Sequence, residues 1–372
     1  MIAWLLISFF VLLFLGVPIA MSLGLSAMGG ILFLGGGSTV TIAQRMFEGM
    51  NSFALLAIPL YTFAGFTMSK GGISKRLMDF CYSIVGHIYG GLAHVNVLSS
   101  MIFAGISGSA VADTAGVSGM FMPEMIRKGY SKNFTVAVTA ISSTIGIIIP
   151  PSIPMVVIAG ICGISTGKLF LGGIIPGILC GLAQMIVSYF MAKKEGVPKE
   201  PGHFTIGPVL HGLWESWPAL LMPIIIVGTI TMGIVSPTEA GVIAVVYGLF
   251  AGGIIYRELK WEDIKFAFAE TVRTSGRIFI VIGAAKLYTV MLTTAGFDKW
   301  VAKTMLGFST NPTVILIMIL LIFFIVTMFM ESIATLTLFM PILYPIALGV
   351  GINPIVLSVL ITVVIGIGLV TP

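Results

Sequence analysis

Two acidic residues stand at matching places in this sequence, each close to long apolar stretches. Asp113 lies eight residues before a Phe-Met-Pro run, and Glu331 lies eight residues before a second copy of that run. A charged carboxylate in the middle of a membrane costs roughly 2.5–3.5 kcal/mol on insertion scales, so acids at such places are usually functional. Unwound backbone beside them can coordinate Na⁺ in secondary transporters. The simpler alternatives are a helix cap at the membrane surface for Asp113 and a structural hydrogen bond for Glu331.

A second motif follows each acid. Gly146 precedes Pro150 by four residues, and Gly368 precedes Pro372 by four. Proline has no amide hydrogen, so carbonyls around Gly146 and Ile149 lose helical partners. A cation would satisfy these carbonyls, but water, a neighbouring side chain or a plain proline kink would also account for the pattern.

The spacing of the two copies indicates an internal duplication. The copies are 218 residues apart at the acids and 222 at the glycines, which fits one small insertion between two halves. Paired interruptions in corresponding halves point to the binding site of a secondary transporter. In the first half the interruption is rich in Gly, Ala and Ser, and Ser107 and Ser109 would add hydroxyl oxygens to a cation site.

The composition decides the class of protein that must position these residues. Hydrophobic residues make up 58% of the 372, charged residues make up 9%, and the mean hydropathy is +1.11. Soluble domains carry about 25% charged residues. Uncharged stretches recur along the chain and predict about ten to twelve helical membrane segments, some of them re-entrant. The chain is therefore expected to be an all-α polytopic membrane protein.

Polar segments organise these helices. The hydrophilic stretch 193–213 divides the chain near its middle, and the mixed stretches 39–51 and 257–272 suit amphipathic helices at the membrane surface. The apolar N-terminus is interpreted as a retained span, not as a signal peptide. The first copy continues for about forty apolar residues after its prolines, whereas the second stops at Pro372, so a complete duplication would include two further segments.

Competing functions leave weaker signals. Basic residues on loops are explained by membrane orientation, and no basic face interleaved with aromatic residues indicates nucleic-acid binding. The phosphate-binding P-loop pattern is absent, which argues against ATP as the energy source. An enzyme would need a paired Asp-Asp, a Ser-His dyad or a His-Glu metal motif, and none is convincing. Lys286 lies in an apolar run, where it would meet an anionic substrate, snorkel to the surface or pair with an acid such as Glu331.

A proton-translocating subunit of a respiratory or antiporter complex is the main alternative. Such a subunit predicts strings of Lys, Glu and His along several helices. Here the acids are few and stand beside Gly, Ser and Pro, which favours binding of an ion together with a substrate.

Four motifs together resemble the large membrane subunit of the tripartite ATP-independent periplasmic (TRAP) transporters, over essentially the whole chain. These motifs are Gly105-Ile-Ser-Gly-Ser-Ala-Val-Ala-Asp113, Phe121-Met-Pro-Glu-Met125, Gly146-Ile-Ile-Ile-Pro-Pro-Ser152 and Ser236-Pro-Thr-Glu-Ala-Gly241.

The resemblance implies a secondary active importer that uses a Na⁺ gradient and no ATP. Its substrates would be organic carboxylates of the C4-dicarboxylate or sialic acid type, delivered by a periplasmic binding protein. A small membrane subunit would be its partner in the bacterial inner membrane, among membrane lipids. The implied fold is an inverted repeat with two re-entrant helical hairpins, in which an elevator-type transport domain moves against a scaffold. The expected segments are 1–98 (scaffold and arm), 99–192 (first hairpin), 193–270 (loop, scaffold and second arm) and 271–372 (second hairpin, incomplete).

The resemblance also implies site residues. The first sodium site would use oxygens at or near Ser107, Gly146, Ile149 and Pro151, with Asp113 close by. The second would use Glu331 and the stretch from Gly368 to Thr371. Substrate would lie between the hairpin tips, near Ser109, Ser152, Ser165 and Thr335.

Overall fold

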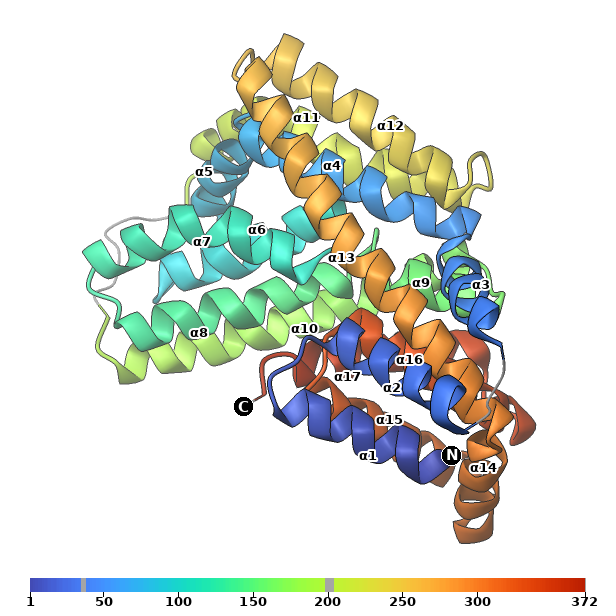
Figure 1. Ribbon diagram of the computed structural model, residues 1–372. Coiled ribbons are helices and arrows are strands. Elements are labelled where there is room, and N and C mark those ends of the chain that lie inside the picture. The colour runs from blue at the N-terminus through green and yellow to red at the C-terminus, as the bar shows by residue number, and fades with distance from the viewer. Residues whose placement is uncertain (35–37, 198–203, 372) are drawn as a thin grey trace. The chain divides into compact units, whose positions relative to one another are not determined.

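The computed structural model describes residues 1–34, 38–197 and 204–371, and within these ranges the chain consists of helices joined by short loops, without strands (Figure 1). The prediction of an all-α fold is confirmed. The α-helices are α1 (Ile2–Phe14), α2 (Ile19–Leu34), α3 (Thr39–Met50), α4 (Ala57–Lys70), α5 (Ile73–Val85), α6 (Gly91–Ser107), α7 (Ala110–Arg127), α8 (Lys132–Ser143), α9 (Ile153–Cys162), α10 (Thr166–Lys194), α11 (Ile206–Thr231), α12 (Pro237–Phe250), α13 (Trp261–Thr294), α14 (Phe297–Phe308), α15 (Pro312–Thr327), α16 (Ser332–Gly349) and α17 (Pro354–Gly368). Three short elements, η1 (Phe53–Leu56), η2 (Thr144–Ile147) and η3 (Ala251–Ile255), extend or join them.

The helices are long and apolar enough for a multi-pass membrane protein. Six of the described helical segments could each cross a membrane by length and composition, and six shorter ones are also apolar. Helix α3 is different, because none of its residues is buried within the chain. Its amphipathic sequence suits a helix at the membrane surface.

The second amphipathic stretch forms no separate helix. Residues 261–272 instead begin α13, which continues without a break to Thr294. In the first half, Asn51 and Ser52 separate α3 from η1, and Pro59 stands in the first turn of α4. Proline is tolerated in a first turn but disrupts a helix interior. The corresponding part of α13 contains no proline, so the helix runs through.

Local sequence signals fix several helix starts. Ser236 and Glu239 form a reciprocal capping box at the start of α12, with Pro237 in the first helical position. The side chains of Asn311 and Asn353 cap α15 and α17, each followed by a proline. These caps satisfy amide groups that have no partner inside the helix.

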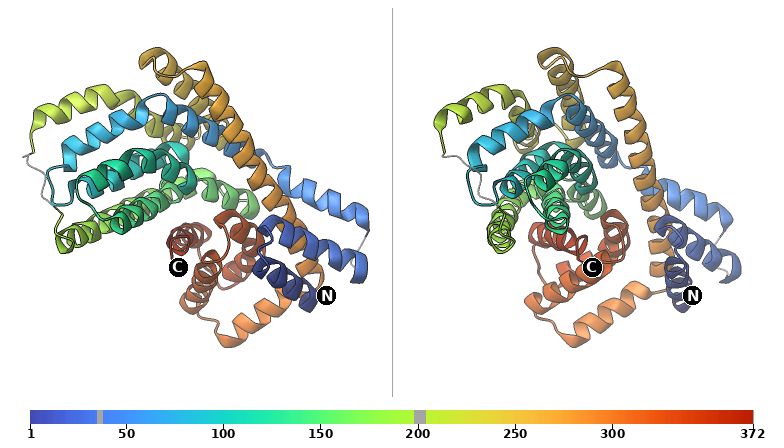
Figure 2. Two further views of the ribbon diagram at one scale, coloured as in Figure 1. Left: turned by 60° about the vertical axis from the view of Figure 1, so that its left-hand side comes forward. Right: turned by 90° about the vertical axis from the view of Figure 1, so that its left-hand side faces the viewer.

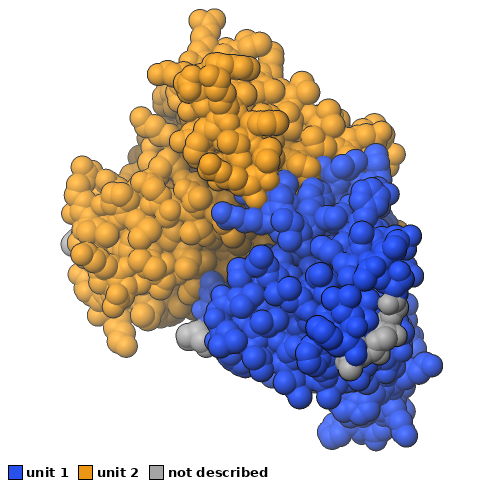
Figure 3. Space-filling model, viewed as in Figure 1, with its two compact units in different colours: residues 1–56, 154–165, 274–372 blue, residues 57–153, 166–273 orange. Residues whose placement is uncertain are grey.

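The described chain divides into two compact units, coloured separately in Figure 3. Unit 1 contains residues 1–56, 154–165 and 274–372. Its core joins α1 and α2 to the second part of α13 and to α16, and Leu5, Leu23, Leu287 and Leu338 are among its buried residues. The Tyr288 hydroxyl donates a hydrogen bond to the carbonyl oxygen of Leu5 at 2.8 Å, which ties α13 to α1.

Unit 2 contains residues 57–153 and 166–273. Within it α6, α8 and α10 lie side by side, as both views of Figure 2 show. Helix α12 approaches α4 closely at Gly241. A Cβ added there would lie 2.8 Å from the Cβ of Leu60, so only a glycine fits. The Tyr61 hydroxyl also donates to the carbonyl oxygen of Pro237 at 2.9 Å.

The order of elements repeats along the chain. A glycine with positive φ, Gly72 in one half and Gly296 in the other, precedes a short helix, α5 or α14. A two-helix hairpin follows, α6–α7 or α15–α16, and then a further helix, α8 or α17. Each unit packs one such copy with a helix pair from the other half of the sequence, α1–α2 in unit 1 and α11–α12 in unit 2. The linear boundaries at 98, 192 and 270 stay a prediction.

Candidate functional site

The tip of the first hairpin is a two-residue break between helices. Helix α6 ends at Ser107, Gly108 adopts φ +65°, and Ser109 caps α7 by accepting a hydrogen bond from the Ala112 amide at 3.4 Å. Gly108 has this conformation because residues with a Cβ rarely adopt it. The break turns the chain back on itself within two residues.

The proline-rich segment crosses this tip. The Ile153 amide donates to the carbonyl oxygen of Gly108 at 3.0 Å, and a Cβ added at Gly108 would lie 2.6 Å from the carbonyl oxygen of Pro151. Pro151 has no amide hydrogen for the Ile147 carbonyl, and the Ser152 hydroxyl donates to that carbonyl instead. The two interrupted segments of the first copy are therefore in direct contact.

Asp113 lies beside this crossing and is fully buried. The Ser107 hydroxyl donates to its Oδ1, whereas its Oδ2 has no hydrogen-bond partner among the described residues. A Cβ added at Gly146 would overlap that Oδ2, so the glycine makes room for the carboxylate. The cap of α7 is Ser109 and not Asp113.

The surroundings of Asp113 explain what it can bind. It stands in the first turn of α7, where amide groups and the helix dipole favour negative charge. Buried polar atoms nearly always have a partner, and a buried carboxylate oxygen without one is costly. A proton, a cation or an ordered water molecule would complete the environment of Oδ2.

A buried polar seam leads toward this site between α6 and α8. The Asn96 Nδ2 donates to Thr139 Oγ1 at 2.9 Å, Ser142 Oγ donates to Asn96 Oδ1 at 2.9 Å, and Ser100 Oγ donates to Ser142 Oγ at 3.1 Å. Ser142 precedes Gly146 by one helical turn. Sequence reasoning missed Asn96, although an amide inside an apolar helix is itself a signal.

The structure brings part of the predicted first cation site together. Ser107, Asp113 and Gly146 meet at one point, and Pro151 contacts the adjoining Gly108. The Ile149 side chain points away from Asp113 and toward α10, where it fills the space that a Cβ at Gly177 would occupy. Only the backbone of Ile149 remains for a ligand role.

The second acid is arranged differently. Glu331 is exposed and caps α16, with its Oε2 accepting from the amides of Ile333 at 3.0 Å and Ala334 at 3.3 Å. Its Oε1 accepts from the Ser332 hydroxyl at 2.9 Å. Both carboxylate oxygens therefore have partners, as the structural alternative for Glu331 expects.

The repeated glycine makes an equivalent contact in the second copy. A Cβ added at Gly368 would overlap Thr327 Oγ1, and it would lie 3.1 Å from the carbonyl oxygen of Phe324. Thr327 occupies the place of Ser109 at the offset of 218 residues, a correspondence that the sequence contains but that the prediction did not use. Thr371 donates to the Ile367 carbonyl at 2.8 Å. Pro372 and residues 198–203 of the central connector lie outside the described residues.

The predicted substrate residues differ in exposure. Ser109 is half-buried and Ser152 is buried, and the two flank the crossing in unit 2. Thr335 is buried in unit 1 and donates to the Glu331 carbonyl at 3.1 Å. Ser165, also in unit 1, is exposed.

Lys286 has an acidic neighbour other than Glu331. Helix α3 packs so closely on α13 that a Cβ at Gly49 would lie 2.6 Å from the Lys286 Cβ. A hydrogen bond from Arg45 and the charge of Lys286 lower the pKa of Glu48. The charge of Lys286 therefore acts on Glu48, whose ion pair is with Arg45 at 2.7 Å.

The described side chains contain no group of three or more His, Cys, Asp and Glu residues placed to hold a metal ion. Any cation site in this part of the chain must therefore draw on hydroxyl and backbone oxygens as well as single carboxylates. Hard cations such as Na⁺ accept such oxygen ligands.

The sequence model of one family, described as "Tripartite ATP-independent periplasmic transporter, DctM component", matches residues 6–372. The isethionate TRAP transporter permease protein DctMQ of Oleidesulfovibrio alaskensis is 38% identical over 98% of this chain and 57% of its own length. The sialic acid large permease SiaM of Vibrio cholerae is 36% identical over 97% of the chain and 84% of its own length. The C4-dicarboxylate large permease DctM of Pseudomonas aeruginosa is 37% identical over 94% of the chain and 82% of its own length. These three names describe permeases, in agreement with the prediction that the chain is not an enzyme.

A solved structure shares the fold. The Alcanivorax borkumensis YdaH transporter, described as having an unusual topology, aligns with a TM-score of 0.55 and 14% identity. The alignment covers 86% of this chain and 76% of that one. At this identity the likeness concerns the arrangement of helices alone.

Proposed function

Because the chain belongs to the DctM component family of the tripartite ATP-independent periplasmic transporters, we propose that it is the permease through which an organic acid enters the cell with Na⁺. The observation that carries this proposal is the Oδ2 of Asp113, which is buried at the crossing of two interrupted helices and has no hydrogen-bond partner among the residues that the structure describes. A bound cation would supply the missing positive charge. Asp113, the Ser107 hydroxyl and nearby backbone carbonyls would hold it.

The residues of the first copy fit a cation better than those of the second. Gly146 leaves the Asp113 carboxylate accessible from the side of η2, and the proline at position 150 removes the amide that would serve the Gly146 carbonyl. Glu331 already holds its own helix cap. A second cation in unit 1 would therefore depend on backbone and hydroxyl oxygens from Gly368 to Thr371 more than on the Glu331 side chain.

The substrate we propose is a small organic carboxylate. Two of the relatives are named for sialic acid and C4-dicarboxylates, which carry carboxylates, and one is named for isethionate, an organic acid whose acidic group is a sulfonate. Ser109 lies at a helix N-terminus, and such ends favour the carboxylate of a substrate. Ser152, which flanks the same crossing in unit 2, would add a hydroxyl to its surroundings. The substrate roles of Ser165 and Thr335 stay predictions.

The partners and motion follow from the same proposal. A periplasmic binding protein would deliver the substrate, and a small membrane subunit would support the permease in the bacterial inner membrane. Each hairpin would move with its copy against the helix pairs α1–α2 and α11–α12, in the manner of an elevator. Neutralising Asp113 before the movement lowers the cost of carrying its charge through the membrane.

A Na⁺ titration of thermal unfolding tests the proposed cation site. The purified protein should unfold at a temperature that rises with NaCl but not with KCl at equal ionic strength, because only a specifically bound ion stabilises by mass action. Asp113→Asn should remove this shift, whereas Glu331→Gln should reduce it far less. An equal response of wild type and Asp113→Asn would remove Asp113 from the site.

Uptake measurements test coupling. Proteoliposomes that contain the permease, its small subunit and the binding protein should accumulate a carboxylate under an inward Na⁺ gradient. A proton on Oδ2 would also satisfy Asp113, which keeps a proton-coupled function as the second candidate. Uptake driven by a pH gradient in the absence of Na⁺ would favour the proton-coupled function.

A further inference from the structure

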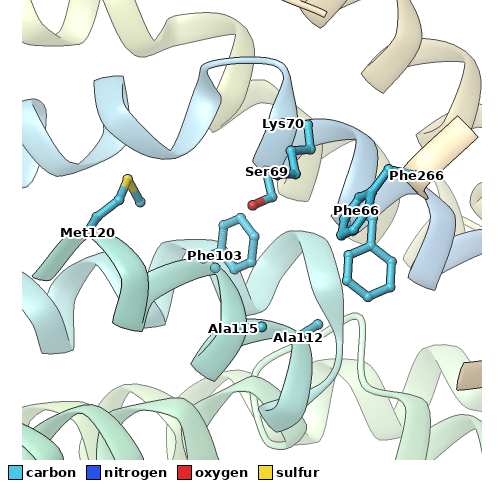
Figure 4. Close-up of a pocket in the computed structure, with 10 residues that line it drawn as sticks. Phe66, Ser69, Lys70, Phe103, Ala112, Ala115, Met120 and Phe266 are labelled. Atoms are coloured by element: carbon cyan, nitrogen blue, oxygen red, sulfur yellow. The ribbon is translucent and has the colours of Figure 1, made fainter. Parts of the chain in front are cut away.

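A cavity in unit 2 stands apart from the Asp113 crossing. It has a volume of about 280 Å³ and lies among α4, α6, α7 and the first turns of α13. Figure 4 shows Ser69 and Lys70 at one side of this cavity, with Phe103 beside them and Ala112, Ala115 and Met120 along α7. The cavity combines an apolar lining with one cationic end.

The apolar part is formed by three aromatic rings and small side chains. Phe66, Phe103 and Phe266 contribute the rings, and Ala112, Ala115 and Gly116 leave the surface of α7 open. Small-molecule sites start near about 300 Å³. This space therefore accepts one acyl-chain segment but not the body of a two-chain lipid.

The polar end lies where a lipid headgroup would lie. Lys70 is the last residue of a helical segment, Phe53–Lys70, that is long and apolar enough to cross a membrane. Its ammonium lies 4.7 Å from the centroid of the Phe266 ring, and within the described residues it forms no ion pair. Basic residues at the end of a membrane-spanning helix meet the phosphates of anionic lipids.

We propose that this cavity binds one anionic phospholipid, with an acyl chain against the three phenylalanines and the phosphate at Lys70 and Ser69. A short organic acid would leave the aromatic lining empty, so it fits this cavity poorly. The lining residues Ala112 and Gly116 flank Asp113 on α7. The bound lipid therefore touches the helix that carries the proposed cation site, although the lipid site itself does not depend on transport.

Native mass spectrometry of the detergent-purified protein tests the proposal. The probes are phosphatidylglycerol and phosphatidylcholine with identical chains. The wild type should retain one phosphatidylglycerol in preference to phosphatidylcholine. Lys70→Gln should lower the retained phosphatidylglycerol about fivefold, the factor expected for one basic side chain at an anionic lipid surface. Lys194→Gln, which removes an exposed cation at the end of α10, is the matched control and should retain the wild-type preference.

A second pair of variants tests the chain-binding part. Ala115→Leu fills the cavity from α7 and should reduce both lipids, whereas Thr114→Leu places the same leucine side chain next to the cavity and should not. If Ala115→Leu fails to fold, the Lys70→Gln comparison decides alone. Equal retention by wild type and Lys70→Gln would overturn the proposal, and so would displacement of phosphatidylglycerol by succinate or inorganic phosphate.

Discussion

Gly146 and Asp113 lie so close together that a Cβ at position 146 would overlap the Oδ2 of the carboxylate. The glycine belongs to η2 and the acid to the first turn of α7, so two interrupted segments meet at one atom. The same Oδ2 is buried and has no partner in the described part of the chain. The missing side chain at Gly146 thus gives the carboxylate its space and also leaves its Oδ2 open to a ligand.

Substituting Gly146 by Ala should displace Asp113 and remove the Na⁺-dependent rise in unfolding temperature. Overpacking of this kind costs about 1–3 kcal/mol, enough to weaken ion binding by about fivefold or more. Gly119→Ala is the control, because a Cβ there meets nothing within 4 Å. A Gly146→Ala protein with the full Na⁺ response would show that the carboxylate is not the ligand.

The second copy offers a parallel test with a built-in rescue. Gly368→Ala should lower the unfolding temperature, because its Cβ would overlap Thr327 Oγ1. Thr327→Ala removes that oxygen, so the double variant should recover part of the loss. Contacting residues of this kind usually couple by about 0.5–3 kcal/mol in a double-mutant cycle. Strict additivity of the two single losses would contradict the contact.

The sequence predicts the interruptions because their causes are local. Gly108 needs positive φ, and Pro150 and Pro151 lack amide hydrogens, so each marks its own break. The two acids also mark hairpin tips in both copies. The fold class follows from composition, since nearly uncharged helices can satisfy their backbone only in a membrane.

Other features depend on tertiary contacts that no local pattern contains. Asp113 lies inside the first turn of α7, whereas Glu331 precedes α16, and this difference of one turn gives the two acids different roles. The pairing of α1 with α13 through Leu5 and Tyr288 joins residues 283 positions apart. Asn96 was missed because its partners come from another helix.

Glu331 is expected to stabilise α16 more than it binds an ion. Glu331→Ala should lower stability by about 1 kcal/mol, the usual loss for a helix cap, whereas Glu331→Gln keeps an oxygen that accepts from the Ile333 and Ala334 amides. Thermal unfolding without Na⁺ measures this difference. If Gln were as damaging as Ala, the negative charge and not the cap would be what matters.

Lys286 is expected to be dispensable for substrate recognition. Its charge acts on Glu48, and Gly49 packs against its stem. Lys286→Met keeps the stem and removes the charge, so carboxylate uptake should keep its KM while thermal stability falls slightly. Glu48→Gln is the matched partner and should behave alike. A large rise in KM confined to Lys286→Met would instead place the ammonium at the substrate.

The buried seam between α6 and α8 should be a large contributor to the stability of unit 2. Asn96→Ala removes the hydrogen bonds that link Thr139 and Ser142 to the amide, and each lost bond costs about 0.5–1.5 kcal/mol. Both hydroxyls keep a backbone carbonyl as acceptor. Ser99→Ala serves as the control, because Ser99 is also buried on α6 but its hydroxyl lies outside this seam. Unfolding temperatures of Asn96→Ala, Ser142→Ala and the double variant measure the effect. We expect the double variant to lose less than the two single losses together, since the amide and the hydroxyl then leave as a pair, and an additive loss would mean that each group is bonded independently.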